Sequence, residues 1–172
     1  MTPPVGTDRE GAFAALTILD GGMSTALEQQ GIEVSGALWT ARLLSDEPER
    51  IARAHRAFFE AGAQIATTAT YQASERGFVA AGLDALEARA LIARGVTIAR
   101  EARDECNAAR PGLLVAASVG PYGAVLGDGS DTYVDVVRTL IEGGADITIR
   151  DGDGVLPGAL APARGYDEIV AL

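Results

Sequence analysis

The sequence predicts an α/β fold with a parallel sheet, because short apolar runs alternate with longer amphipathic helical patterns. Three apolar runs predict strands, at residues 16–22, 64–70 and 113–120. Two helical patterns separate them, one within residues 45–63 and one over residues 84–105. This order is typical of βαβ units, in which right-handed crossovers bring successive strands together in parallel.

The first run, LTILDGG at residues 16–22, is apolar until two glycines interrupt it. It therefore predicts a buried strand followed by a tight turn. The stretch TALEQQG at residues 25–31 has room for one or two helical turns. Residues 1–14 are expected to form a loose leader.

Residues 45–63, SDEPERIARAHRAFFEAGA, carry the start and stop signals of a helix. Pro48 suits the first turn, Asp46 or a neighbour is expected to cap it, and Gly62 is expected to end it. The apolar positions recur at helical spacing and predict the face turned to the core: Ile51, Ala54, Phe58 and Ala61.

After the second run, QIATTAT, a polar connection with two glycines leads to the helix over residues 84–105. The apolar stripe of that helix contains Ala88, Leu91, Gly95, Ile98 and Ala102. The third run, LLVAASVG, is apolar almost throughout, as expected for a strand that is covered on both faces.

The composition excludes several classes of protein. A net charge of −10 disfavours binding to nucleic acid or to an anionic membrane surface, both of which need clustered Lys and Arg. No apolar run approaches the roughly 20 residues that span a bilayer, and no secretory signal is visible at the start. With Cys106 as the only cysteine, an internal disulfide is excluded. A cytoplasmic location is expected.

Polar residues gather where the predicted strands end. Asp20, Thr68, Thr70 and Ser118 lie at or just beyond the carboxyl ends of the three runs. Ligands bind at that edge in open α/β sheets and in β/α barrels. An alternative stays open, since Thr and Ser at strand ends often satisfy loop backbone groups, and Asp before Gly-Gly is ordinary turn chemistry.

Five stretches in order carry a resemblance: ILDGGMSTALEQQG, LWTARLL, AGAQIATTATYQAS, GF and VAASVGPYGAVLGDGS. Together they resemble the homocysteine S-methyltransferase family over roughly residues 16–130. The resemblance implies the first three βα units of a (β/α)8 barrel. It also implies methyl transfer from a sulfonium or related donor to the thiol of homocysteine.

The resemblance also implies roles for individual residues. Asp20 matches the acidic residue near the amino-acid substrate, where its carboxylate would pair with the substrate ammonium, and Gly21 and Gly22 would let the backbone approach closely. The remaining matches are expected to line the substrate pocket or to lie behind its lining: Thr68, Thr70, Tyr71, Gln72, Ser118, Gly120, Pro121 and Tyr122. No catalytic residue is assigned within the chain.

Zinc is expected for the intact family, in which three cysteines from the second half of the barrel hold it. These ligands are absent from this sequence. Cys106 falls near the end of a helix, away from the ligand edge, and is expected to be a structural or surface cysteine. His55 lies within the first long helix and is expected to be a surface or packing residue.

The end of the chain follows another pattern. Tyr133, Asp135, Val136 and Val137 repeat as Tyr166, Glu168, Ile169 and Val170, an offset of 33 residues that matches the ankyrin period. This predicts a methyltransferase-like domain over residues 1–131 and a short α-helical ankyrin-like segment over residues 132–172. In an alternative interpretation, residues 133–150 form a further α/β unit of the barrel.

Three barrel strands leave two sheet edges and an apolar inner face open, which predicts self-association or a protein partner. The alternatives to a methyltransferase are an ankyrin-type protein-binding module and an inactive rearranged gene product.

Overall fold

The computed structural model describes residues 17–34, 39–120, 133–142 and 144. Nearly all of them belong to one unit, Ile18–Ala145. A second unit, Met1–Thr17 with Asp146–Leu172, lies outside the described residues except for Thr17. Most of the predicted ankyrin-like segment, together with Pro121 and Tyr122, therefore lies outside them as well.

The sheet has β1, Ile65–Thr67, beside β2, Leu114–Ala116. The two strands are parallel, with Ile65 opposite Leu114. On the other edge of β1, Leu19 forms a parallel bridge with Ile65, and the Asp20 N–H donates to the Ile65 carbonyl at 2.9 Å. Three successive segments thus lie side by side in parallel, which confirms the predicted order.

The prediction of a buried first strand was wrong. Leu19 makes an isolated bridge rather than a strand, and Ile18 and Leu19 are 52% and 57% exposed. Side chains alternate between the faces of a sheet, and Ala66 points to the helices, so the row of Leu19, Ile65 and Leu114 lies on the opposite face. The apolar run therefore predicted correctly that this segment joins the sheet, but it did not predict that Ile18 and Leu19 are exposed.

Six helices are described, and most flank the three sheet segments. They are α1 (Met23–Glu28), α2 (Trp39–Asp46), α3 (Pro48–Ala61), α4 (Glu75–Ala80), α5 (Ala85–Asn107) and α7 (Tyr133–Glu142). Within these described helices, none combines the length and apolar character that crossing a bilayer requires.

Helix α3 begins and ends close to the predicted signals. Pro48 occupies its first turn, and Gly62 ends it with φ of 116°, a left-handed conformation that favours glycine. The capping residue is Glu47 rather than Asp46, and it makes no side-chain cap bond. Of the predicted apolar face, Ile51 and Ala54 are buried.

Helix α5 has a complete capping box. The Asp84 side chain accepts from the Glu87 N–H, and the Glu87 carboxylate accepts from the Asp84 N–H. Helix α4 falls where a polar connection was predicted. Its start is fixed by Ser74, whose hydroxyl oxygen accepts from the Gly77 N–H at 3.0 Å.

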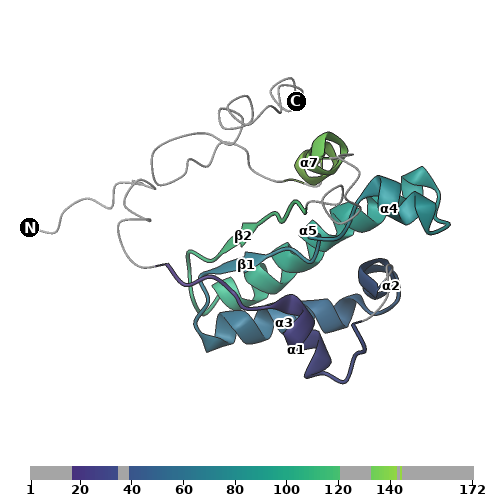
Figure 1. The fold of residues 1–172 in the computed structure, drawn as a ribbon. Coiled ribbons are helices and arrows are strands. Elements are labelled where there is room, and N and C mark those ends of the chain that lie inside the picture. The colour runs from purple at the N-terminus through teal and green to yellow at the C-terminus, as the bar shows by residue number, and fades with distance from the viewer. Residues whose placement is uncertain (1–16, 35–38, 121–132, 143, 145–172) are drawn as a thin grey trace, which may run out of the picture. The chain divides into compact units, whose positions relative to one another are not determined.

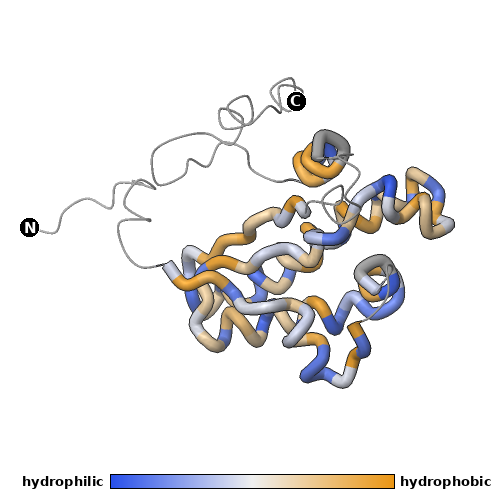
Figure 2. The backbone as a smooth tube through the Cα atoms, viewed as in Figure 1, coloured by the Kyte–Doolittle hydropathy of each residue, from blue (hydrophilic) through white to orange (hydrophobic). Residues whose placement is uncertain are grey.

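Helices α3 and α5 cover one face of the sheet (Figure 1). Ala66 on β1 is fully buried against Phe59 of α3 and Leu113, and Cys106 of α5 packs at the edge of this cluster. Figure 2 shows hydrophobic residues along β1, β2 and the segment before α1. This position agrees with the prediction that Cys106 is a structural or surface cysteine.

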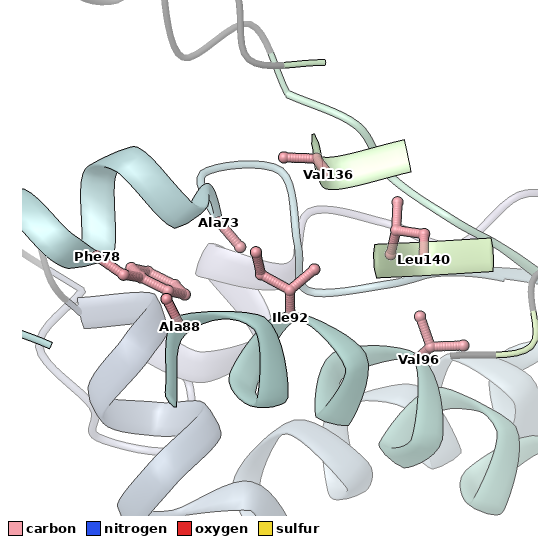
Figure 3. Packing of buried hydrophobic residues seen from close by; sticks show 7 residues of the cluster. All are labelled: Ala73, Phe78, Ala88, Ile92, Val96, Val136 and Leu140. Carbon is pink, nitrogen blue, oxygen red and sulfur yellow. The ribbon is translucent and has the colours of Figure 1, made fainter. Parts of the chain in front are cut away.

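A second core joins α5 to α4 and α7 (Figure 3). Ile92 and Val96 of α5 pack with Val136 and Leu140 of α7, and Phe78 of α4 packs near Ala88. Helix α7 therefore belongs to the same unit as the sheet, which is the packing that the alternative interpretation of residues 133–150 requires. The domain division at residue 131 stays a prediction.

His55 is a buried packing residue of α3. It is fully buried, and neither ring nitrogen has a hydrogen-bond partner within the part of the chain that the structure describes. Burial lowers the pKa of His55 from its ordinary 6.5 to about 4, because the charged imidazolium loses its solvation. The side chain is therefore neutral at pH 7.

The burial of His55 predicts a pH dependence of stability. The folded pKa lies below the unfolded one, so the unfolded state binds the proton first as the pH falls, and stability is lost between about pH 6.5 and pH 4. For a shift of this size the loss is about 3 kcal/mol. His55→Leu should remove this part of the pH dependence, as measured by urea unfolding from pH 4.5 to 8.

His55→Gln is the matched control, because it is polar but does not titrate. It should flatten the pH dependence equally while unfolding more easily than His55→Leu at every pH, since a buried amide without partners costs about 1–3 kcal/mol. Unchanged pH dependence in both variants would contradict the assignment.

Candidate functional site

The polar residues predicted to share a sheet edge do share it. Asp20 follows the bridge at Leu19, Thr68 comes directly after β1, and Ser118 lies two residues beyond β2. Because the segments are parallel, these carboxyl ends meet at one rim. The rim contains two hydrogen-bonded groups.

The first group joins Asp20 to Thr67. The Thr67 N–H donates to Oδ2 of Asp20 at 2.7 Å, and the Thr67 hydroxyl donates to Oδ1 at 2.8 Å. Asp20 is half-buried, and the two glycines that follow it are exposed. A Cβ atom added at Gly21 would lie 2.8 Å from Cε1 of Phe58, so glycine lets the turn sit on that ring.

The second group is a closed ring of hydrogen bonds through Thr68, Thr70 and Ser118. The Ser118 N–H donates to the Thr68 hydroxyl oxygen at 2.8 Å, and the Thr70 hydroxyl donates to the Ser118 carbonyl at 2.6 Å. The two hydroxyls are 2.7 Å apart. Because Thr70 has already given its one proton to Ser118, Thr68 must be the donor between them.

The ring occupies the protons of both threonine hydroxyls. Thr68 and Thr70 are 3% and 0% exposed, whereas Ser118 is half-buried, so both hydroxyls lie on the protected side of the ring. These bonds to the Ser118 backbone are of the kind that the alternative interpretation anticipated. A contact between these threonines and a substrate stays a prediction.

Helix α5 supports the ring from behind. A Cβ atom added at Gly95 would lie 2.6 Å from Cγ2 of Thr70, too close for any other residue without a shift. Thr70 cannot easily turn away, because its hydroxyl is fixed in the ring. Gly95 was predicted only as part of an apolar stripe, and its structural reason is this close approach.

Beyond the ring, the rim carries aromatic side chains. Tyr71 is 56% exposed, and the Trp39 indole N–H donates to Oε1 of Gln72 at 2.9 Å. The Tyr71 carbonyl oxygen occupies the place that a Cβ atom at Gly120 would take, so only glycine fits there. The roles of Thr67 and Trp39 were not predicted. Both lie inside the quoted motifs, but nothing in the sequence singles out their partners.

The described residues do not fit a zinc site. Within the described ranges, no three side chains of the His, Cys, Asp or Glu type come together as a metal would require. His55 is enclosed in the core, and Cys106 packs on the helix-covered face of the sheet, where burial raises the pKa of its thiol. That the zinc ligands of the family lie outside this chain stays a prediction.

A groove of about 420 Å³ runs along the helices, and no rim residue lines it. Its lining comes from α2, α5 and the residues just before α5: Arg42, Ser45, Asp46, Leu83, Glu87, Ala90, Leu91 and Arg94. The groove is therefore separate from the rim, to which the sequence motifs point.

Residues 17–150 match the family model described as homocysteine S-methyltransferase. The chain belongs to the homocysteine S-methyltransferase family. The match continues through residue 150, so the segment 133–150 falls within the family region. The ankyrin-like interpretation gains no support from this match and stays a prediction.

Relatives and solved structures agree with the family. The chain is 43% identical over 152 residues to homocysteine S-methyltransferase YbgG of Bacillus subtilis, and 42% identical over 149 residues to homocysteine S-methyltransferase of Escherichia coli. Each match covers 77% of this chain and 48% of the relative. The chain thus spans about half the length of these relatives.

The fold is similar to that of the homocysteine methyltransferase MmuM from Escherichia coli in its metallated form. The TM-score is 0.73 at 36% sequence identity, and the match covers 92% of this chain and 63% of that structure. This likeness supports a barrel-type α/β fold for the described unit.

The close approach at Gly95 predicts a steric conflict. Gly95→Ala should lower the free energy of unfolding by about 1–2 kcal/mol, because overpacking against Thr70 outweighs the better helix propensity of Ala. In a Thr70→Ser background, which lacks Cγ2 but keeps the hydroxyl, the same change should be neutral or stabilising. Thermal and urea unfolding of the four proteins tests this reversal, and equal effects in both backgrounds would contradict it.

The ring predicts a cost for removing one hydroxyl. Thr68→Val should destabilise the chain by about 1–3 kcal/mol, because the Ser118 N–H loses its acceptor and Thr70 loses its donor in a buried place. Thr97→Val on α5 is the control, since its exposed hydroxyl donates only to the Ala93 carbonyl and its loss should matter by less than about 0.5 kcal/mol. Similar urea midpoints for both variants would rule out a stabilising ring.

Proposed function

We propose that this chain binds the amino-acid end of homocysteine for methyl transfer to its thiol. The family and the relatives support this substrate, and the observation that carries the proposal is the Asp20 carboxylate at the rim. Asp20 is half-buried, and Thr67 holds its carboxylate at the rim, the edge where ligands bind in this class of fold.

The chemistry of the site follows from charge and shape. An ammonium group pairs with an ionised carboxylate through charge-assisted hydrogen bonds, which are about twice as strong as neutral ones. The exposed backbone at Gly21 and Gly22 leaves room for the rest of the amino acid beside Asp20. Tyr71, half exposed on the same rim, is proposed to border the pocket.

Thr68, Thr70 and Ser118 are proposed to act behind the pocket. Their ring joins the ends of β1 and β2, so it fixes the spacing of the rim on which Asp20 and Tyr71 lie. In the reaction, the thiol loses its proton and its sulfur forms a bond to the methyl carbon as the donor's bond to that carbon breaks. Zinc, when bound in such a site, would lower the thiol pKa, and the described residues do not hold it.

Substitution of Asp20 tests the proposal. Asp20→Asn keeps the shape and removes the charge, so the affinity of the full chain for L-homocysteine should fall at least tenfold in isothermal titration calorimetry. Asp46→Asn, an exposed carboxylate at the end of α2, is the matched control and should leave the affinity unchanged. Equal affinity of the Asp20→Asn variant and the wild type would refute the proposed role.

A further inference from the structure

One residue holds both oxygens of the Asp20 carboxylate. The N–H and the hydroxyl of Thr67 donate to Oδ2 and Oδ1 at 2.7 and 2.8 Å, distances within the ordinary range of well-formed hydrogen bonds. Thr67 is the last residue of β1, which the sheet holds on both sides. The direction of the carboxylate is therefore set by the sheet through Thr67.

Within the part of the chain that the structure describes, these two bonds leave acceptor positions of the Asp20 carboxylate free. An ionised carboxylate has about four lone-pair positions, and Thr67 occupies two of them. The half-buried Asp20 precedes two exposed glycines, so a ligand has access from that side. A ligand ammonium can then bind without breaking either bond to Thr67.

The neighbouring threonines cannot replace Thr67. The hydroxyl protons of Thr68 and Thr70 are both used within the buried ring, one toward Thr70 and one toward the Ser118 carbonyl. The Asp20 N–H is also engaged, with the Ile65 carbonyl. Neither Thr68 nor Thr70 therefore has a hydroxyl proton left to donate to Asp20, and the Thr67 hydroxyl supplies that bond.

We propose that Thr67 is a positioning residue, whose hydroxyl fixes the side-chain conformation of Asp20 so that the carboxylate meets the ammonium group of the amino-acid substrate. The inference rests on the proposed role of Asp20 and adds the residue that orients it. Because the backbone N–H persists in every variant, the hydroxyl is the part that a substitution removes.

The test compares two ligands that differ only in the ammonium group. Thr67→Val should weaken binding of L-homocysteine to the full chain about tenfold, and Thr67→Ser should restore it. Binding of 4-mercaptobutanoate, which has the thiol and the carboxylate but no amine, should be the same in all three proteins. Circular dichroism and the unfolding midpoint show whether each variant is folded.

The outcomes separate the inference from the function on which it rests. Loss of affinity for both ligands alike, or for neither, would overturn the positioning role while leaving the proposed substrate intact. If the wild type binds no L-homocysteine, the proposed function fails. The 13C signal of the Asp20 carboxyl group then decides: a change in Thr67→Val that Thr67→Ser lacks supports the orientation by Thr67, and identical signals in all three proteins overturn it.

Discussion

The rim of this protein depends on threonine hydroxyls that continue the sheet where its backbone ladder stops. Strands β1 and β2 are only three residues long, so their carboxyl ends have few ladder bonds to hold them. Thr67 ties the end of β1 to Asp20 on one side, and Thr68 and Thr70 tie it to Ser118 on the other. Three segments that are distant in sequence are thereby kept at fixed spacing.

This arrangement demands small residues behind it. Gly95 lets α5 approach the methyl group of Thr70, and Gly120 lets the chain after β2 approach the Tyr71 backbone. The packing of α3 leaves one buried polar side chain unsatisfied, because the ring nitrogens of His55 have no hydrogen-bond partner among the described residues. The two glycines thus let neighbouring segments fit closely against the rim. The buried His55 of α3, in contrast, lowers the stability of the fold, because its ring nitrogens lose their hydrogen bonds to water.

The sequence predicted the elements whose signals are local. Pro48 and Gly62 bounded α3 nearly to the residue, and the order of parallel segments followed from the alternation of patterns. Helix α4 was missed because Gly77 lies inside it and glycine is a poor helix former, so the cap at Ser74 was overlooked. The exposure of Leu19 was missed because an apolar run does not reveal which face of a sheet is covered. The contact between Thr67 and Asp20 was missed because the two residues are 47 positions apart in the sequence. No spacing rule shows that Thr67, rather than the neighbouring Thr68, bonds to Asp20.

Helix α5 is the element that most of the others touch: α2, α3, α4, α7 and both strands all pack on it. Its inner surface must therefore satisfy several neighbours of different shape at once, with small residues such as Ala88, Gly95 and Ala102 buried along it. A substitution on that surface therefore affects the packing of several neighbouring elements at the same time. A substitution accepted there needs matching adjustments on more than one neighbouring element, so α5 is expected to vary more slowly among descendants of this chain than the helices that each meet it on a single side.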